Sequence, residues 1–337
     1  MTRRERVRAA ITFQETDFIP YDIGLTHPAH EKMVKFYNDE NFARDWGGHF
    51  ASVYYDGGTA PMPGRKDYYQ DHFGVVWNRT MDKDIGVIEN FVIPEPDMSL
   101  YTLPPVPEEL IRQQCEHVMA HRGDLFSFGS IGFSLFERAW TLCGMENLLI
   151  YMHTDPDFVT ELFDAIAEFN LKIVDIYLEY DFDAIFFGDD WGQQSGLITG
   201  PVMWRKFIKP PLAKMYARAR ENGRFVMQHS CGDIEEIYPD LVEIGLNTHQ
   251  TFQPEIFDIH EIKRLYHGKL SFWGGVSTQR MLPFETPEGV VAKTKEIMEV
   301  MGKGGGFIVA PTHSVPGDVP AENIDALIKL FKNQSGV

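Results

Sequence analysis

A histidine and a cysteine stand two residues apart in the stretch "FVMQHSCGDI", residues 225–234, which ends on a glycine-containing turn. Residues i and i+2 of an extended chain point to the same face, so His229 and Cys231 share a side. Imidazole nitrogen and thiolate sulfur suit Zn²⁺, but a catalytic zinc usually has three protein ligands and an open position. On spacing alone, a buried cysteine beside a hydrogen-bonded core histidine is the simpler explanation.

Other side chains able to bind metals or move protons follow apolar runs elsewhere in the chain. They are Asp189, Asp190, His249, Gln250, Gln253 and His313. His313 is the natural third ligand or a general acid/base, and a loop histidine is an equally good interpretation. Asp189 and Asp190 leave their strand on opposite sides, so at most one should face a pocket. We expect the other to cap the following turn.

The elements that carry these residues alternate between short apolar strands and helices. Predicted strands are 17–24, 125–132, 183–190, 224–230, 246–250, 269–275 and 306–311. Predicted helices are 155–180, 201–223 (interrupted near Pro210 and Pro211), 234–245 and a last helix from Pro320. Asp155 and Pro156 are typical of a helix start, with Asp155 as the cap. Such alternation implies parallel strands with right-handed crossovers.

This pattern favours an α/β fold of one particular kind, a single TIM-type (β/α)8 barrel formed by residues 1–337, with an N-terminal extension. A doubly wound dinucleotide fold is disfavoured because no strand–GxGxxG–helix unit is present. Residues 54–110 are irregular and rich in Pro, Gly and Tyr, and we expect an excursion over the barrel mouth or a surface loop. The carboxyl ends of barrel strands form the active-site face, so the polar residues should converge there.

Composition narrows the classes of partner. The 337 residues carry a formal net charge of −18, which argues against nucleic acid and against an anionic membrane surface. No apolar stretch approaches the roughly 18 residues of a membrane span, and the N-terminus lacks a signal-peptide core. Three cysteines, Cys115, Cys143 and Cys231, make no disulfide framework. We therefore expect a cytoplasmic protein.

Four motifs together resemble the uroporphyrinogen decarboxylase superfamily. They are "GDDWGQQSGLI", "HSCGDI", "SFWGGVSTQRMLP" and "GGFIVAPTHSVPGDVPAENI", and the likeness runs over nearly the whole chain. The resemblance implies a single βα barrel. The superfamily contains true decarboxylases and zinc-dependent methyltransferases that take methyl groups from corrinoid proteins.

The two branches differ in chemistry. The decarboxylases hold a tetrapyrrole with eight carboxylates by arginines near the first strand, in an Arg-x-x-Gly-Arg pattern. Here that region reads "IPYDIGLTHPAH" and contains no arginine, so a polyanionic substrate is electrostatically unfavourable. The methyltransferases carry His-x-Cys and a later Cys, whereas this chain has His313 in the later place. Histidine is also a good zinc ligand, but fewer thiolates leave the nature of the acceptor open.

The resemblance therefore implies a zinc-dependent methyltransferase that moves a methyl group between a corrinoid on a partner protein and a thiol or folate acceptor. His229, Cys231 and His313 would hold Zn²⁺, and Asp190 or Asp189 would orient a ligand histidine or the acceptor. Candidate substrate-binding residues are Tyr54, Trp191, Gln253 and Trp273, with core packing as the alternative for both tryptophans. A decarboxylase-like lyase, a metal-free enzyme or a non-catalytic binding barrel remain alternatives. The resemblance is also compatible with a homodimer.

Overall fold

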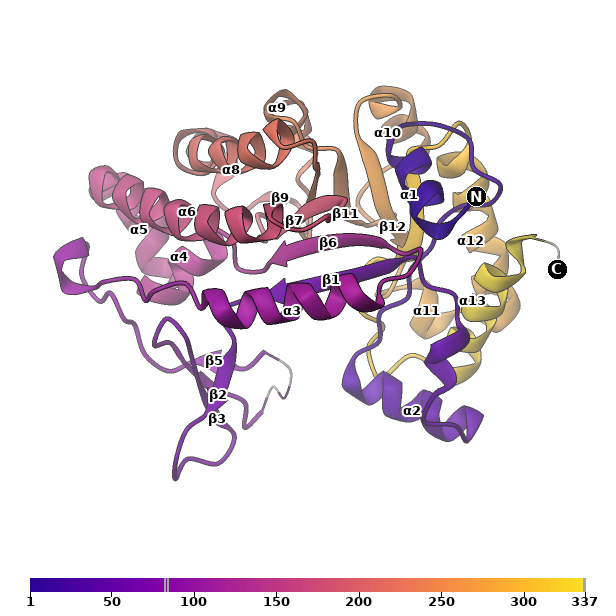
Figure 1. The fold of residues 1–337 in the computed structure, drawn as a ribbon, viewed down its shortest axis with the longest axis horizontal. Coiled ribbons are helices and arrows are strands. Elements are labelled where there is room, and N and C mark those ends of the chain that lie inside the picture. Colours follow the sequence, from indigo (N-terminus) through magenta and orange to yellow (C-terminus); the bar gives the residue numbers. More distant parts are fainter. Residues whose placement is uncertain (82, 84, 336–337) are drawn as a thin grey trace.

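A curled sheet of seven parallel strands forms the centre of the molecule (Figure 1). The computed structural model describes residues 1–81, 83 and 85–335. The strand order is β1-β6-β7-β10-β11-β12-β13. Their bounds are β1 Phe50–Tyr55, β6 Phe126–Ile131, β7 Ala184–Gly188, β10 Phe225–His229, β11 Thr248–Phe252, β12 Ser271–Val276 and β13 Phe307–Pro311. The predicted α/β class and the last six of these strands are confirmed.

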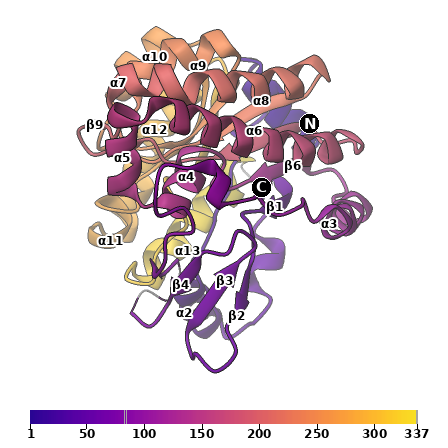
Figure 2. The ribbon, with the colours of Figure 1, turned by 90° about the vertical axis from the view of Figure 1, so that its left-hand side faces the viewer.

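Helices cover the outside of the sheet, as expected for right-handed βα crossovers (Figures 1 and 2). The helices of the described chain, among which α1 packs against the interior of the sheet instead, are α1 Arg3–Ile11, α2 His27–Tyr37, α3 Glu108–His121, α4 Phe136–Cys143, α5 Met145–Thr154, α6 Pro156–Leu178, α7 Gly200–Met203, α8 Lys209–Glu221, α9 Tyr238–Ile244, α10 Ile259–Tyr266, α11 Met281–Phe284, α12 Pro287–Gly302 and α13 Ala321–Lys332. Short 3-10 turns span Phe42–Asp45, Met98–Leu100, Glu235–Ile237 and Asn333–Ser335, and a π-helical turn spans Trp204–Ile208.

Two details of the predicted helices need correction or refinement. Asp155 does not cap α6 with its side chain; its carboxylate instead accepts a hydrogen bond from Thr154 Oγ1 at 2.6 Å. The interruption of the 201–223 helix is the π turn that lies just before Pro210 and Pro211.

The predicted first strand, residues 17–24, is not a strand of the sheet. Within the described chain this segment and the residue after it make only isolated parallel bridges, Tyr21 with Val309 of the last strand and Leu25 with Val315 of the loop that follows. On its other side, the segment contacts the ring of His49, the residue before β1. His49 Nδ1 lies 3.1 Å from the Tyr21 carbonyl oxygen. The segment therefore occupies the gap between β13 and β1 without a continuous ladder. Part of the reason is that Pro20 has no N–H to donate.

The side chains inside the curled sheet form their own apolar cluster. Its members include Phe126, Phe128, Met227, Trp273 and Ile308. Val7 and Ile11 of α1 belong to the same cluster, so this helix packs against the interior of the sheet. A much larger apolar layer fills the space between the sheet and the outer helices. None of the described helices is both long and apolar enough to cross a membrane.

The excursion between β1 and α3 contains a small antiparallel sheet. Its strands are β2 Thr59–Pro61, β3 Tyr68–Asp71, β4 Val76–Asn78 and β5 Val87–Ile88. The β1 and β6 arrows point to the left in Figure 1, and Figure 2 shows the molecule from that side. In this view the small sheet lies below the helices. An ion pair between Asp71 and Arg138 of α4, at 2.9 Å and with both side chains 2% exposed, fixes it to the main fold.

A candidate metal site at the carboxyl ends of the strands

Three potential zinc ligands meet where β10 and β13 end. One ligand atom each from His229, Cys231 and His313 lies within 4.8 Å of the others. Cys231 Sγ is 3.6 Å from His229 Nε2. Zinc bonds of about 2.3 Å to sulfur and about 2.0 Å to nitrogen give a tetrahedral edge of roughly 3.5 Å. The chemistry of the three donors and this spacing therefore fit a zinc ion.

The neighbours of His229 orient its ring toward the other two residues. His229 Nδ1 is hydrogen-bonded to the side-chain oxygen of Gln250, which stands beside it in the parallel ladder of β10 and β11. With the Nδ1 proton donated to Gln250, Nε2 is directed toward Cys231 Sγ. Sequence analysis noticed Gln250 at its strand end but gave it no role.

Asp190 lies against both ends of the His229–Cys231 pair. Its Oδ1 is 3.3 Å from His229 Nε2 and accepts the backbone N–H of Cys231 at 2.8 Å. Burial alone would raise the pKa of Asp190, but the hydrogen bond and charge of His229 outweigh it and lower the pKa to about 2. For His229 burial opposes the charged form, and the bonds to Asp190 and Cys231 raise its pKa well above the ordinary value. The His313 pKa is lowered, first by burial and then by the charge of His229.

Asp189 has a different position from Asp190. Its carboxylate is buried and accepts the backbone N–H groups of Phe136 and Glu137, at 2.9 and 2.7 Å, at the start of α4. Trp191 Nε1 donates to the same carboxylate at 2.6 Å. Burial raises the Asp189 pKa to about 6 despite these hydrogen bonds. Only Asp190 faces the cavity, and the element that Asp189 caps is α4 and not the turn that follows it.

Two glycines allow the loops after β7 and β10 to touch. A Cβ on Gly192 would lie 2.6 Å from the Cys231 carbonyl oxygen, and a Cβ on Gly232 would overlap the Gly192 backbone. Gly232 also has φ +79°, which side chains rarely adopt. This close contact is what brings Asp190 to the backbone of Cys231.

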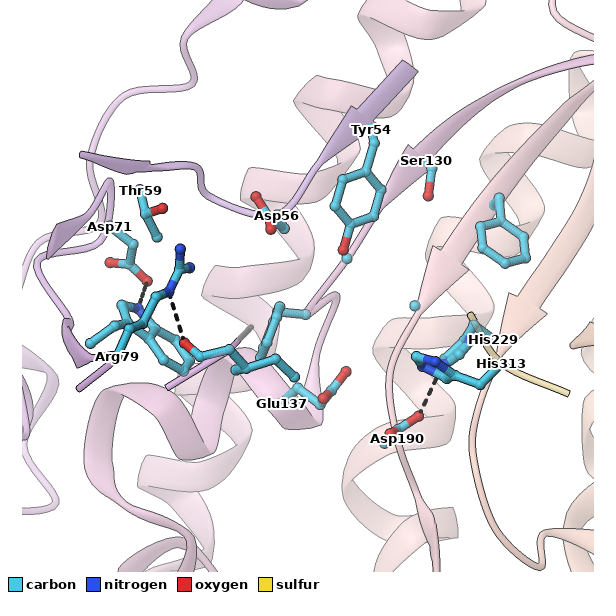
Figure 3. A pocket seen from close by; sticks show the side chains of 16 residues that line it. Tyr54, Asp56, Thr59, Asp71, Arg79, Ser130, Glu137, Asp190, His229 and His313 are labelled. Atoms are coloured by element: carbon cyan, nitrogen blue, oxygen red, sulfur yellow. Dashed lines mark hydrogen bonds and ion pairs between the residues drawn. The ribbon is translucent and has the colours of Figure 1, made fainter. Parts of the chain in front are cut away.

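A cavity of about 330 Å³ opens beside the three ligands (Figure 3). Its lining comes from the strand ends, from α4 and from the excursion: Tyr54, Asp56, Thr59, Asp71, Trp77, Arg79, Ile85, Ser130, Gly132, Phe133, Glu137, Phe186, Gly188, Asp190, His229 and His313. Tyr54 is thus the member of the predicted substrate-binding set that lines the cavity. Glu137, in "LFERAW", was missed by sequence analysis, and a charged pair inside an apolar helix was the available signal.

The other predicted substrate-binding residues pack behind this lining. Trp191 is 1% exposed and lies edge-on to Trp204 at 5.4 Å. The Gln253 side-chain oxygen accepts the Gly232 N–H at 2.9 Å. Trp273 is stacked on Phe50, with 4.4 Å between the ring centres. A direct role of these three in substrate binding stays a prediction.

His249, also at a strand end, lies in the core. Its Nδ1 is 2.9 Å from the Tyr238 hydroxyl and its Nε2 is 3.1 Å from the Ser230 carbonyl oxygen. Burial lowers the His249 pKa to about 3, and these contacts suit a neutral ring that donates from Nε2 and accepts at Nδ1. The residue supports the loop that carries Cys231.

The chain belongs to the uroporphyrinogen decarboxylase (URO-D) family, whose pattern it matches over residues 83–334. It is 24% identical over 197 residues to a methylated-thiol–coenzyme M methyltransferase of Methanosarcina mazei, a match that covers 58% of this chain and 50% of the relative. It is 22% identical over 194 residues to a uroporphyrinogen decarboxylase of Coxiella burnetii, covering 55% of this chain and 50% of the relative. Both alignments therefore span about half of each relative's length.

A solved structure described as a methyltransferase from Methanosarcina mazei has a similar fold. The TM-score is 0.71 at 18% sequence identity, and the alignment covers 99% of both chains. This likeness concerns the fold alone, and it includes the described residues 1–81, which precede the family match.

Proposed function

We propose that this protein is a zinc-dependent methyltransferase that moves a methyl group between a corrinoid held by a separate protein and a small thiol or folate acceptor. The observation that carries the proposal is the convergence of His229, Cys231 and His313, with ligand atoms within 4.8 Å of one another, beside a cavity that both histidines line. The family membership and the methyltransferase among its relatives support the same reaction class.

Each residue of the site has a distinct task in this proposal. His229, Cys231 and His313 would hold the ion, which when bound supplies a Lewis acid that lowers the pKa of a thiol acceptor. Gln250 fixes the His229 ring, and Asp190 ties that ring to the Cys231 backbone. Asp189 and Trp191 hold the start of α4, and with it Glu137, against the site.

The reaction itself is a displacement at the methyl carbon. The acceptor sulfur (or folate nitrogen) forms a bond to this carbon, and the cobalt–carbon bond breaks with its electron pair left on cobalt. The acceptor loses its proton to solvent. The cavity beside the three ligands orients the acceptor so that its nucleophilic atom points to the mouth, where a corrinoid on another protein can approach.

The decarboxylase alternative is disfavoured by the charges of the cavity. Four carboxylates line it, from Asp56, Asp71, Glu137 and Asp190, whereas Arg79 is the single Lys or Arg in the described lining. An octacarboxylate would meet repulsion here and few bidentate arginine partners. We therefore expect no conversion of uroporphyrinogen to coproporphyrinogen at an enzymatic rate.

Methylcobalamin provides a direct test of methyl transfer. We expect zinc-loaded protein to change the cobalt absorption spectrum when a thiol or tetrahydrofolate is added, and Cys231→Ala protein to leave it unchanged. The assay is run with free methylcobalamin at high concentration and repeated with a methylated corrinoid protein. Unchanged spectra in both formats, with all thiols and with tetrahydrofolate, would show that the proposal is wrong.

A further inference from the structure

The cavity beside the candidate metal site has aromatic walls. Four aromatic residues line it: Tyr54 of β1, Trp77 of β4, Phe133 of the loop that follows β6, and Phe186 of β7. Trp77 and Phe133 meet edge to face with 5.8 Å between ring centres. Aromatic faces carry a negative quadrupole and attract organic cations.

The carboxylates of the cavity are not equally available to a ligand. Asp71 is neutralised by Arg138 at 2.9 Å, and Asp190 is engaged by His229 and the Cys231 N–H. The carboxyl groups of Asp56 and Glu137 are the two that remain available to bind a ligand. Among the described residues, the Asp56 side chain accepts only the Gly58 N–H, at 2.9 Å, and neither carboxylate has an ion pair with a described lysine or arginine.

These two carboxylates flank the same aromatic ring. The pKa of the Tyr54 phenol is raised by burial first and then by the charges of Asp56 and Glu137, so both carboxylates act on this part of the cavity. A Cβ on Gly132 would overlap the Tyr54 hydroxyl and lie 3.2 Å from Asp56 Cβ, which shows how closely the two side chains pack there. In Figure 3 Glu137 lies below Tyr54 and to the left of the His229–His313 pair.

Arg79, the cationic residue of the lining, has partners of its own. Its Nε donates to the Ile85 carbonyl oxygen at 3.2 Å, and its guanidinium lies over the Tyr69 ring, 4.6 Å from the ring centre. Figure 3 places it at the end of the cavity opposite His229 and His313. The space between that end and the ligands is therefore lined by aromatic rings and by the carboxyl groups of Asp56 and Glu137. Burial, followed by the charges of Asp190 and Asp189, raises the pKa of Glu137 well above its ordinary value, and a cation bound beside it would favour its ionised form.

We propose that the cavity selects a small thiol acceptor that carries an ammonium group. Asp56 and Glu137 would bind the ammonium, Tyr54 and Trp77 would pack against its carbon chain, and the thiol would point to His229, Cys231 and His313. The proposal rests on the methyl-transfer function proposed above and adds the charge of the acceptor. It predicts rejection of anionic thiols, since they would face the same two carboxylates.

Three thiols of matched chain length test the proposal: 2-aminoethanethiol, 2-mercaptoethanol and 2-mercaptoethanesulfonate. Their dissociation constants are measured by titration calorimetry with zinc-loaded protein. We expect the ammonium thiol to bind about tenfold or more tightly than the neutral one, the scale of a hydrogen bond to a charged group, and the sulfonate to bind most weakly. Equal affinities, or tightest binding of the sulfonate, would overturn the proposal.

Variants show whether the named carboxylates cause the preference. The isosteric double change Asp56→Asn with Glu137→Gln should bring the three dissociation constants within a few fold of one another. Glu146→Gln, on the exposed surface of α5, should leave the spread unchanged. An unchanged spread in the double variant would also overturn the proposal. Failure of the methyl-transfer function would be seen separately, as missing zinc or an unchanged cobalt spectrum with all three thiols.

Discussion

At the scale of single residues, His229 has the most constrained position in the site. One ring nitrogen is bonded to Gln250 on the neighbouring strand, and the other lies 3.6 Å from Cys231 Sγ and 3.3 Å from Asp190. His313, by contrast, comes from the loop after β13 and is an exposed residue. The ligand role of His313 can be tested by replacing this residue.

Replacement of His313 separates a ligand from a proton-transfer group. If it is a ligand, His313→Ala should weaken zinc binding by more than the roughly 10- to 100-fold typical of losing an outer partner. His313→Cys should restore binding because thiolate suits the same tetrahedral corner. Zinc titration of the two variants, with exposed His153→Ala as the control, gives the answer.

An unchanged zinc affinity in His313→Ala protein would contradict the ligand role. In that case the acid/base alternative predicts that alanine keeps the metal and loses activity. The pH–rate profile would then lose a limb near the imidazole pKa of about 6.5.

At the scale of elements, the cavity depends on how the excursion is joined to α4. Asp71 accepts the N–H groups of Phe73 and Val75, each at 2.9 Å, as well as the Arg138 guanidinium. Arg138 also donates to the Asp56 carbonyl oxygen at 2.6 Å. One buried ion pair thus links β3, the end of β1 and α4, which together supply much of the cavity wall.

Breaking this pair should destabilise the protein strongly. Arg138→Met leaves a buried carboxylate without its cationic partner, and we expect a loss of about 3–5 kcal/mol in the free energy of unfolding. The double variant Arg138→Met with Asp71→Asn should lose less than the sum of the single changes, because it removes the uncompensated charge. Urea denaturation gives the free energy of unfolding of the two single variants and the double variant. A loss below about 1 kcal/mol in Arg138→Met would contradict the expected effect.

The alternation of apolar runs and helices predicted β6, β7 and β10 to β13 because buried parallel strands read as short continuous apolar stretches. It missed β1 because "FASVYY" is not a continuous apolar run: Val53 and Tyr55 are buried, whereas Ser52 and Tyr54 are exposed, and Tyr54 lines the cavity. It also predicted a strand over residues 17–24 that does not form, since Pro20 lacks the backbone N–H that a continuous ladder needs. Local pattern does not encode how completely a strand pairs with distant neighbours.

The residues of the candidate site also differ in whether the sequence could predict them. His229, Cys231, His313 and Asp190 could be found because each follows a strand, and strand ends meet on one face of a βα fold. Glu137 offered only a weak signal, the charged pair inside an apolar helix, and Asp56 offered none, because α4 and the excursion reach the cavity through long-range packing that no local spacing encodes. The family match at residues 83–334 also leaves Asp56 outside its range.

At the scale of the whole molecule, buried histidines tie stability to pH. The pKa of His249 is about 3 in the folded protein and about 6.5 when unfolded, so the unfolded chain binds more protons between these values. Its stabilising contribution is thus fully present above pH 6.5 and falls as the pH is lowered toward 3. The buried Asp189, with a pKa of about 6, has the opposite sign and partly offsets it.

A His249→Gln variant isolates this contribution. Glutamine can accept from Tyr238 and donate to the Ser230 carbonyl but cannot be protonated. We expect the stability advantage of the wild type over the variant to shrink by a few kcal/mol from pH 7 to pH 4. Chemical denaturation at several pH values measures this difference in unfolding free energy, and His153→Gln, at an exposed position, is the control. A difference that does not change with pH would show that His249 is not held neutral.

The central claim is that this fold brings His229, Cys231 and His313 together to hold zinc, and the metal content of the purified protein tests it most directly. Elemental analysis should find about one zinc per chain, and Cys231→Ala protein should lose most of it while its circular dichroism stays unchanged, since a ligand at the mouth is not part of the core. Wild-type protein that is isolated without zinc and takes none up on titration would contradict the account.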